Sequence, residues 1–208
     1  MLLLPGLGGL QVAPESDVPP QKLSETGLYA DIGSGKVSAD VRGFTPQYPL
    51  WSDGSLKQRW IRLPAGAGID ATRADAWQFS PGTRLWKEFS MGRRVETRLI
   101  ERQSDGRWRY ATYVWNAEGS EALLAPENGI AAAPVAAAPN GKYRILAQAD
   151  CRACHESAPT PVLGFSARQL SPDRDRRAAN AMRPRRACPW TSTWRNACRH
   201  PPVIRWKT

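Results

Sequence analysis

Short runs of alternating apolar and polar residues dominate the first two thirds of the chain. Each run is rich in aromatic and β-branched residues and is bounded by glycine, proline, aspartate or serine, which is typical of β-strands. The runs cover residues 56–64, 76–79, 84–91, 94–102 and 107–116. No βαβ alternation separates them. The pattern therefore predicts a mainly β fold, an antiparallel sandwich or jelly-roll-like domain.

The clearest pair of predicted strands is 94–102 with 107–116. Between them, Asp105-Gly106 supplies the positive φ that a tight hairpin turn requires. On the second strand, alternation places Trp108, Tyr110, Thr112 and Val114 on one face and Arg109, Ala111, Tyr113 and Trp115 on the other. Because both faces carry aromatic residues, we expect this strand to be covered on both sides or to line a pocket.

Two cysteines and a histidine lie close together after the predicted strands. Cys151, Cys154 and His155 form the sequence C-x-x-C-H. This is the attachment signature of a c-type haem, in which both thiols add covalently to the porphyrin and the histidine ligates the iron. In a helix, positions i, i+3 and i+4 share one face, so all three side chains can reach one flat cofactor. The motif predicts one covalent haem c with His155 as the metal ligand.

Three other interpretations of the motif are a zinc half-site, a thioredoxin-like redox pair and a structural disulfide. Zinc would need partners such as Cys188, Cys198 and His200, whose spacing does not match the usual close pairs. A thioredoxin-like pair should follow a strand within a βαβ unit, which the pattern lacks. Neither of these two explains why a histidine directly follows the second cysteine.

Apolar residues follow the motif within a proline-rich stretch. Val162, Leu163 and Phe165, together with Leu170, are the natural apolar wall for a haem. Too few residues remain before position 175 to build a standard three-helix cytochrome c. The β domain or the C-terminal part of the chain must therefore cover the porphyrin.

Composition divides the chain into five parts. Residues 1–22 are interpreted as a leader with a signal remnant, and residues 23–129 as the β-rich domain. Residues 130–142, rich in alanine and proline, are expected to form a semi-rigid linker. Residues 143–175 would be a short, partly helical haem-attachment segment, and residues 176–208 form a basic tail.

The net charge of +10 arises almost entirely in that tail, which is part of a chain of 208 residues. Residues 176–208 contain no acidic residue and nine basic ones, which are Arg176, Arg177, Arg183, Arg185, Arg186, Arg195, Arg199, Arg205 and Lys207. The tail has no apolar periodicity, and its arginine, proline, alanine, cysteine and tryptophan are what a GC-rich gene yields out of frame. A frameshift near residue 176 is the favoured interpretation, with a disordered tail or a basic binding arm as alternatives. The charge therefore does not predict a nucleic-acid partner.

The first ten residues, MLLLPGLGGL, are apolar but lack a basic region and are interrupted by Pro5. They are compatible with the end of a signal peptide. No other stretch reaches the roughly 18 apolar residues of a membrane-spanning helix. The expectation is a soluble mature protein without a membrane span.

Tryptophans on the predicted strands raise the possibility of sugar binding by stacking. The candidates are Trp51, Trp60, Trp77, Trp86, Trp108 and Trp115. Core packing is the commoner role of a strand tryptophan and is favoured here. Asp53, Lys57 and Arg59 are candidates for a polar site, but charged residues near a turn are usually solvated. No paired carboxylates, Ser-His-Asp set or phosphate-binding loop stands out.

Several phrases, in order, resemble one family of bacterial proteins. They are YPLWSDGSLKQRWIRLPAG, WQFSPGTRLWKEF, RRVETRLIER, WRYATYVWN, YRILAQADCRACHE and PVLGFSARQLSPDRD, which span roughly residues 23–175. The family is that of largely uncharacterised cytochrome c domain-containing or haem-binding proteins. The resemblance implies a periplasmic or otherwise extracytoplasmic protein with one covalent haem, attached at Cys151 and Cys154 and ligated by His155. Family members continue in frame past SPDRD, whereas this chain departs there.

The second iron ligand decides the mechanism. Met91, Met182 and His200 are weak candidates for it. A six-coordinate iron would make the protein an electron carrier with a redox partner protein, and this function is favoured over an enzyme. The alternatives are a β-sandwich accessory or ligand-binding module with a structural haem, and a haem enzyme with an open distal site.

Overall fold

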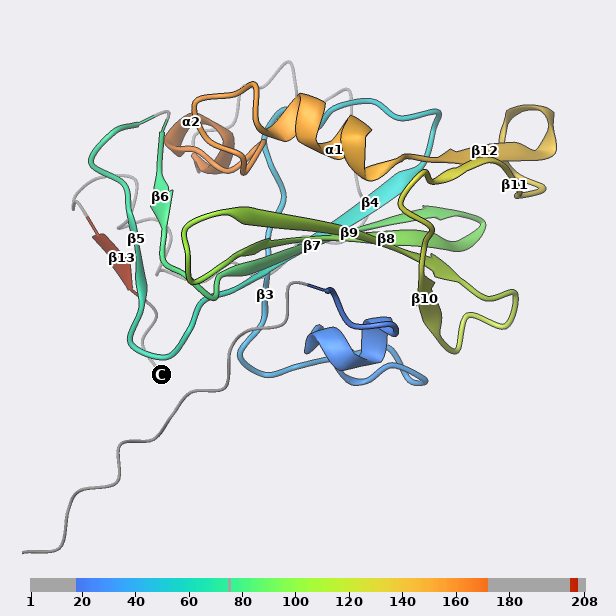
Figure 1. Ribbon diagram of the computed structural model, residues 1–208, viewed down its shortest axis with the longest axis horizontal. Coiled ribbons are helices and arrows are strands. Elements are labelled where there is room, and N and C mark those ends of the chain that lie inside the picture. Colours follow the sequence, from blue (N-terminus) through green and yellow to red (C-terminus); the bar gives the residue numbers. More distant parts are fainter. Residues whose placement is uncertain (1–17, 75, 172–202, 206–208) are drawn as a thin grey trace, which may run out of the picture.

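A six-stranded antiparallel sheet forms the centre of the computed structural model, which describes residues 18–74, 76–171 and 203–205 (Figure 1). Its strand order is β10-β9-β8-β7-β4-β3. The strands are β3 (Arg42–Gly43), β4 (Leu56–Arg62), β7 (Arg84–Met91), β8 (Arg93–Arg102), β9 (Trp108–Trp115) and β10 (Ala122–Leu124). The expectation of a mainly β, antiparallel, sandwich-like fold is confirmed.

Smaller elements complete the described part. Two-stranded sheets pair β1 (Tyr29–Asp31) with β2 (Lys36–Val37) and β11 (Ile130–Pro134) with β12 (Lys142–Ile145). A third sheet contains β5 (Gly68–Asp70), β6 (Gln78–Phe79) and β13 (Val203–Arg205). The helical elements are η1 (Leu23–Thr26), η2 (Pro139–Gly141), α1 (Gln148–His155) and α2 (Ala167–Leu170).

The predicted hairpin forms between β8 and β9. The two strands pair in register from Glu96 opposite Val114 to Arg102 opposite Trp108. Gly106 adopts a φ of 87° in the turn, as the Asp-Gly pair predicts. Both faces of β9 are covered, so that Tyr110 and Tyr113, which point to opposite sides, are each buried.

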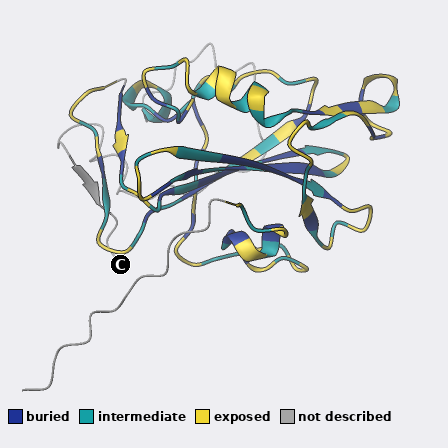
Figure 2. Cartoon of the chain, in the orientation of Figure 1, coloured by how far each residue is buried: buried dark blue, intermediate teal, exposed yellow. Residues whose placement is uncertain are grey.

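Separate layers cover the two faces of the sheet (Figure 1). On one face, η1 and the β1–β2 hairpin cover a core that contains Leu28, Trp60, Trp86 and Trp115. On the other face, the segment after α1 packs with β5 and β6 over a core that contains Ile61, Leu85 and Phe165. Figure 2 shows the sheet largely buried between these layers, whereas α1 exposes much of its surface.

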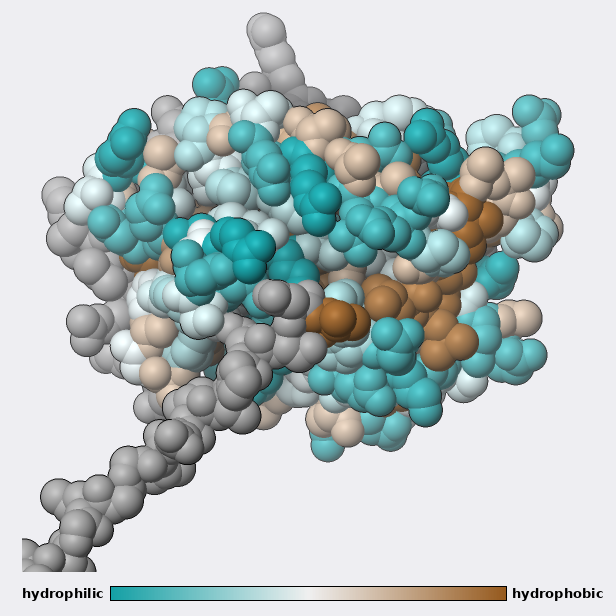
Figure 3. All heavy atoms as spheres, in the orientation of Figure 1, coloured by the Kyte–Doolittle hydropathy of each residue, from teal (hydrophilic) through white to brown (hydrophobic). Residues whose placement is uncertain are grey.

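Most strand tryptophans serve the core, as expected. Trp60, Trp77, Trp86 and Trp115 are buried, whereas the Trp51 side chain is 75% exposed. In Figure 3, hydrophilic residues cover most of the visible face, and hydrophobic residues gather toward the β10 end of the sheet. There, the N-terminal segment covers the edge strand, since the Leu124 amide donates to the Gln21 carbonyl at 2.9 Å. This contact protects an edge that would otherwise be open to pairing.

The linker predicted for residues 130–142 is wrong. These residues form β11 and η2, and the hairpin with β12 buries Ala133, Val135 and Ala138 against Val95 of the main sheet. Alanine side chains are small enough to let this hairpin lie close to its neighbours. The basic tail lies outside the described residues, apart from Val203–Arg205, whose backbone pairs with β5.

Gly129, just before β11, lies close to the backbone that joins β12 to α1. It has a φ of +69°, and an added Cβ would lie 2.3 Å from the Ile145 carbonyl oxygen. Gly129→Ala is therefore expected to lower the free energy of unfolding by about 2–5 kcal/mol, through both clash and strain. Gly35→Ala is the matched control, because its φ is +71° with nothing within 4 Å, and should cost about 1–2 kcal/mol. Urea denaturation measures both, and equal losses would contradict the close approach at Gly129.

Candidate functional site

The C-x-x-C-H sequence lies on α1, which the chain forms immediately after β12. Asp150 stabilises the first turn, since its carboxylate accepts a hydrogen bond from the Ala147 amide at 3.1 Å. The helix ends after His155, where the Glu156 amide donates to the Arg152 carbonyl. The motif is thus helical, and its three side chains occupy the i, i+3 and i+4 positions.

The three side chains of the motif differ in exposure. Cys151 and His155 are half-buried where α1 meets the sheet, whereas Cys154 is exposed. Both cysteines are free thiols. Burial raises the pKa of the Cys151 thiol, and the nearby Arg98 guanidinium opposes this shift. One thiol therefore faces the sheet, and the other lies at the open side of α1.

The His155 imidazole is held in one orientation. Its Nδ1 lies 2.5 Å from the Pro161 carbonyl oxygen. Because a carbonyl can only accept a hydrogen bond, Nδ1 carries the proton, and Nε2 of the neutral ring keeps its lone pair. The ring also lies against Tyr110, with centroids 5.5 Å apart. Burial lowers the pKa of His155, and Lys87 and Arg98 add to this effect. A fixed, neutral imidazole is the form that ligates a metal.

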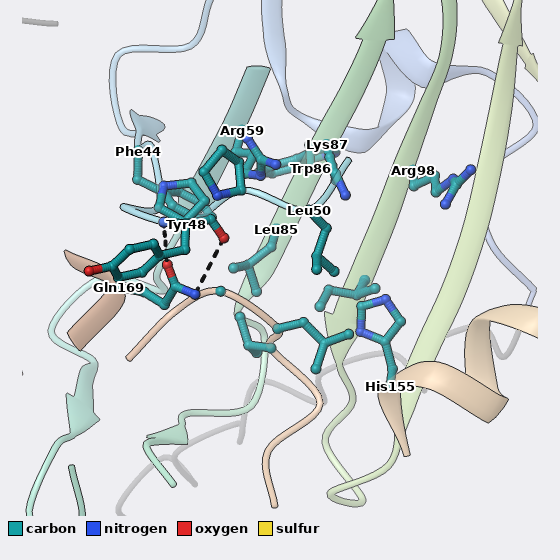
Figure 4. A pocket seen from close by; sticks show the side chains of 16 residues that line it. Phe44, Tyr48, Leu50, Arg59, Leu85, Trp86, Lys87, Arg98, His155 and Gln169 are labelled. Carbon is teal, nitrogen blue, oxygen red and sulfur yellow. Dashed lines mark hydrogen bonds between the residues drawn. The ribbon is translucent and has the colours of Figure 1, made fainter. Parts of the chain in front are cut away.

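His155 lines a cavity of about 320 Å³ between α1, β4, β7, β8 and the loop that follows β3 (Figure 4). The volume lies within the usual range for ligand sites. Its walls are formed by Phe44, Pro46, Tyr48, Pro49, Leu50, Arg59, Leu85, Trp86, Lys87, Arg98, Ile100, His155, Val162, Leu163, Gly164 and Gln169. Tyr48 and Gln169 close one side together, because the Tyr48 amide donates to Gln169 Oε1 at 2.9 Å.

The register of the sheet divides the floor of this cavity into an apolar row and a cationic row. Leu85 on β7 lies opposite Ile100 on β8. Two residues along the same face, Lys87 lies opposite both Arg98 on β8 and Arg59 on β4. A side chain on a strand shares its face with the residues two positions away. The cavity therefore has one apolar half and one half bordered by three cations.

The three cations are not equivalent. Arg98 forms an ion pair with Glu96, which is fully buried and also accepts a hydrogen bond from the Tyr143 hydroxyl at 2.9 Å. Burial lowers the pKa of Arg59 to about 10. Burial, together with Arg59, Arg98 and Lys57, lowers the pKa of Lys87 to about 7. Among the described residues, neither Arg59 nor Lys87 has a carboxylate within ion-pair distance. In the described part of the chain, two of the three cations at the cavity thus form no ion pair, although the charge of Glu96 also acts on Lys87.

The apolar wall expected after the motif is present in part. Val162 and Leu163 line the cavity beside His155. Phe165 does not line it and is fully buried in the core, with its ring centroid 4.8 Å from that of Phe44. Its aromatic surface packs better among Phe44, Trp77 and Phe79 than it would at a half-open wall. The expectation that Phe165 lines the haem site is therefore corrected.

None of the candidates for a second iron ligand lines the cavity within the described part of the chain. Met91 packs against the core around Val95 and Tyr143 and does not line the cavity. Met182 and His200 lie outside the described residues, as do Cys188 and Cys198. Within the described part of the chain, the cavity wall contributes one histidine and no methionine.

The described residues contain no group of three or more histidines, cysteines or acids able to hold a metal ion by themselves. A haem needs only an axial ligand from the protein, because the porphyrin supplies four nitrogens. The residues present fit such a group: His155 offers a neutral Nε2, two thiols precede it on α1, and an apolar row adjoins two cations that form no ion pair within the described residues. The buried Tyr110 hydroxyl, which finds no hydrogen-bond partner among the described residues, lies on the same side of the sheet.

The lowered pKa of Lys87 predicts a pH dependence of stability in the haem-free chain, prepared as Cys151→Ala/Cys154→Ala. The groups facing Lys87 are Arg59 and Lys57 on β4, Arg98 and Glu96 on β8, and His155 on α1. Between the folded pKa of about 7 and the unfolded value of 10.5, the unfolded state binds the extra proton. Stability therefore rises with pH, by roughly 2 kcal/mol from pH 7 to 9.

Lys87→Met should abolish this rise in urea denaturation, while the exposed control Lys36→Met should retain it. An unchanged pH profile in Lys87→Met would show that Lys87 is not desolvated.

Sequence reasoning found His155 but missed the importance of Arg59 and Lys87. The sequence predicts a solvated Arg59, because charged residues near a turn are usually solvated, whereas Arg59 is half-buried and lines the cavity. Alternation along β4 and β7 predicts which residues share a face with Arg59 on β4 and with Lys87 on β7. That these faces coincide follows only from the pairing of Arg59 with Lys87, which lie 28 positions apart.

Comparison with known proteins gives no identification, since no protein-family model, curated protein or solved structure matches the chain. Within the described residues, no helix combines the length and apolar character that crossing a membrane requires.

Proposed function

We propose that this chain is a c-type cytochrome-like protein that carries one covalent haem outside the cytoplasm and transfers electrons to a redox partner protein. One observation carries the proposal. The imidazole of the C-x-x-C-H sequence lies at a cavity, and its Nδ1–H donates a hydrogen bond to the Pro161 carbonyl, which leaves Nε2 available. This is the arrangement in which a second contact fixes the tautomer and orientation of a metal-ligating histidine.

Each residue of the motif has a distinct role in this proposal. Cys151 and Cys154 would each hold the porphyrin by a thioether bond, with the sulfur and hydrogen of the thiol added across one vinyl group. His155 would ligate the iron from α1, where Pro161 and Tyr110 hold the imidazole. The haem supplies a one-electron couple at its iron. Val162, Leu163, Leu85 and Ile100 exclude water from the macrocycle.

The β domain has a structural role in the same proposal. A c-type haem on a short segment needs a cover, and the face of the sheet beneath α1 provides one. Leu85 and Ile100 contribute apolar surface from β7 and β8, and the Tyr48–Gln169 contact joins the loop after β3 to α2. The sheet thereby replaces the additional helices of a helical cytochrome.

A second candidate function is a haem protein with an exchangeable ligand on the far side of the iron. The composition of the described cavity wall favours it, because this wall holds neither a methionine nor a second histidine. Adding carbon monoxide to the reduced protein separates the two functions. An unchanged absorption spectrum supports the electron carrier, and a shifted Soret band supports the open site.

The proposal is tested by exporting the full chain with a periplasmic signal and haem-maturation factors. Covalent haem should survive denaturing electrophoresis and stain for peroxidase activity. Cys151→Ala/Cys154→Ala should lose the stain, whereas Cys188→Ala, the matched control outside the motif, should keep it. His155→Ala should lose iron ligation and alter the visible spectrum. A folded, exported wild-type chain without the stain would overturn the proposed function.

A further inference from the structure

Three basic side chains lie side by side across three strands, on the face of the sheet on which α1 packs. Arg59, Lys87 and Arg98 form one row, because each is directly opposite its neighbour in the register of the sheet. Like charges in this position repel one another and destabilise a sheet. All three are also half-buried, which adds a desolvation cost unless an opposite charge is present. The row is therefore unfavourable unless something anionic binds there.

Glu96 lies near two members of the row but forms an ion pair with only one of them. It pairs with Arg98 and is itself fully buried. Arg59 and Lys87 remain without an acidic partner among the described residues. Lys87 instead lies over the Phe89 ring, 4.7 Å from its centroid. Arg59 on β4 and Lys87 on β7 are thus the members of the row that an anionic ligand would stabilise most.

The order of the strands places Arg59 and Lys87 away from the attachment cysteines. α1 packs on β9, and β8, β7 and β4 follow in that order. Adjacent strands lie about 4.8 Å apart, so Lys87 and Arg59 are roughly 10 and 14 Å across the sheet from β9. Arg98, on β8, is near enough to influence Cys151. In a haem c, the two propionate carboxylates lie on the edge of the macrocycle opposite the thioether bonds.

The polarity of the cavity matches the same orientation. Leu85 and Ile100 lie two residues along their strands from Lys87 and Arg98, on the same face, and Val162 lines the cavity with His155. Figure 4 shows Arg59 and Lys87 at one side of the cavity and His155 at the other. An apolar macrocycle with carboxylates on one edge complements these two halves.

We propose that Arg59 and Lys87 bind the haem propionates, and that this contact fixes the orientation of the haem over the sheet. The inference rests on the proposed haem function. Arg98 remains paired with Glu96 and supports the floor of the site. Haem carboxylates thereby neutralise the repulsive row, and the haem-loaded chain is stabilised where the haem-free chain is strained.

The test uses the full chain, exported and loaded with haem, in three variants. Arg59→Gln and Lys87→Met remove the charges, and Arg59→Lys retains one. Arg73→Gln and Lys36→Met are matched controls, because both side chains are exposed. Resonance Raman spectroscopy reads the propionate bending bands, which respond to contacts at the carboxylates. Redox titration reads the midpoint potential.

Arg59→Gln and Lys87→Met should shift the propionate bands, while Arg59→Lys and both controls remain close to wild type. Removing a cation favours the ferric state, so the ratio of oxidised to reduced protein at fixed potential should rise three- to tenfold, or up to about 59 mV. Unchanged bands would overturn the inference even if the potential moved, because a charge acts on the iron through space. A wild-type chain without haem would instead overturn the proposed function.

The free energy of unfolding gives a second readout. A purely structural role of Lys87 would change it in the same direction with and without haem. Lys87→Met should stabilise the haem-free Cys151→Ala/Cys154→Ala chain, because it removes repulsion, and destabilise the haem-loaded chain, because it removes a propionate contact. This reversal of sign supports the inference. The same sign in both forms would overturn it.

Discussion

Trp86→Ala is expected to lower the free energy of unfolding by about 3–5 kcal/mol, among the largest losses in this fold. Trp86 lies on β7 and is 1% exposed. It packs against the core of the face that η1 covers, and its Nε1 donates a hydrogen bond to Thr26 Oγ1 at 3.1 Å. The substitution therefore removes a large apolar side chain and the hydrogen bond between η1 and the sheet.

Urea denaturation of the haem-free Cys151→Ala/Cys154→Ala chain measures this loss. Trp86→Phe is the control, because it keeps an aromatic ring in the core and loses the indole N–H with a smaller part of the apolar volume. It should cost about 1–2 kcal/mol. A loss below about 1.5 kcal/mol for Trp86→Ala would mean that the site collapses around the cavity or that η1 does not pack as described.

Glu96→Leu is expected to cost about 3–5 kcal/mol, because it leaves a buried cation without its partner. Glu96 is fully buried between Arg98 and the Tyr143 hydroxyl. Without it, the row of Arg59, Lys87 and Arg98 loses its nearest negative charge. We expect the loss of unfolding free energy to be larger in the haem-free chain, since no propionate is then present.

A double-mutant cycle isolates the pair. Glu96→Leu/Arg98→Leu should recover about 2–3 kcal/mol relative to the sum of the single losses, because neither charge is then left alone. The exposed Glu118→Leu is the control and should change stability by less than about 0.5 kcal/mol. Simple additivity of the two single losses would contradict an ion pair at this position.

The strands that the sequence predicted best are those with strict alternation and an explicit turn. β7, β8 and β9 follow the expected ranges closely, and Gly106 forms the expected turn. Residues 130–142 misled the prediction because alanine and proline resemble a linker, although Ala133 and Ala138 are buried. Composition reports the size and polarity of side chains, whereas burial of an alanine depends on what packs over it.

The candidate site was predictable where it is local in sequence. Cys151, Cys154 and His155 are adjacent in the chain, so their spacing alone predicts a shared helical face. Phe165 was assigned to the haem wall because it follows the motif, but it turns into the core beside Trp77. The contact of His155 with Pro161 and the pairing of Arg59 with Lys87 depend on tertiary register. Neither has a signature in the sequence.

The charge row also connects the fold to its proposed use. A protein that needed only a stable sheet would gain from an apolar residue at Lys87, because burial and three neighbouring cations oppose its charge. A ligand with carboxylates in the cavity would explain these cations, because its negative charge would offset their repulsion. The same half of the cavity then contributes to haem orientation and to the potential of the iron.

Intact mass spectrometry of the exported full chain, under denaturing conditions, tests the haem proposal most directly. The account predicts that the chain carries the added mass of one haem and that Cys151→Ala/Cys154→Ala lacks this addition. A folded wild-type chain, made alongside active haem-maturation factors, whose mass matches its unmodified sequence would contradict the account.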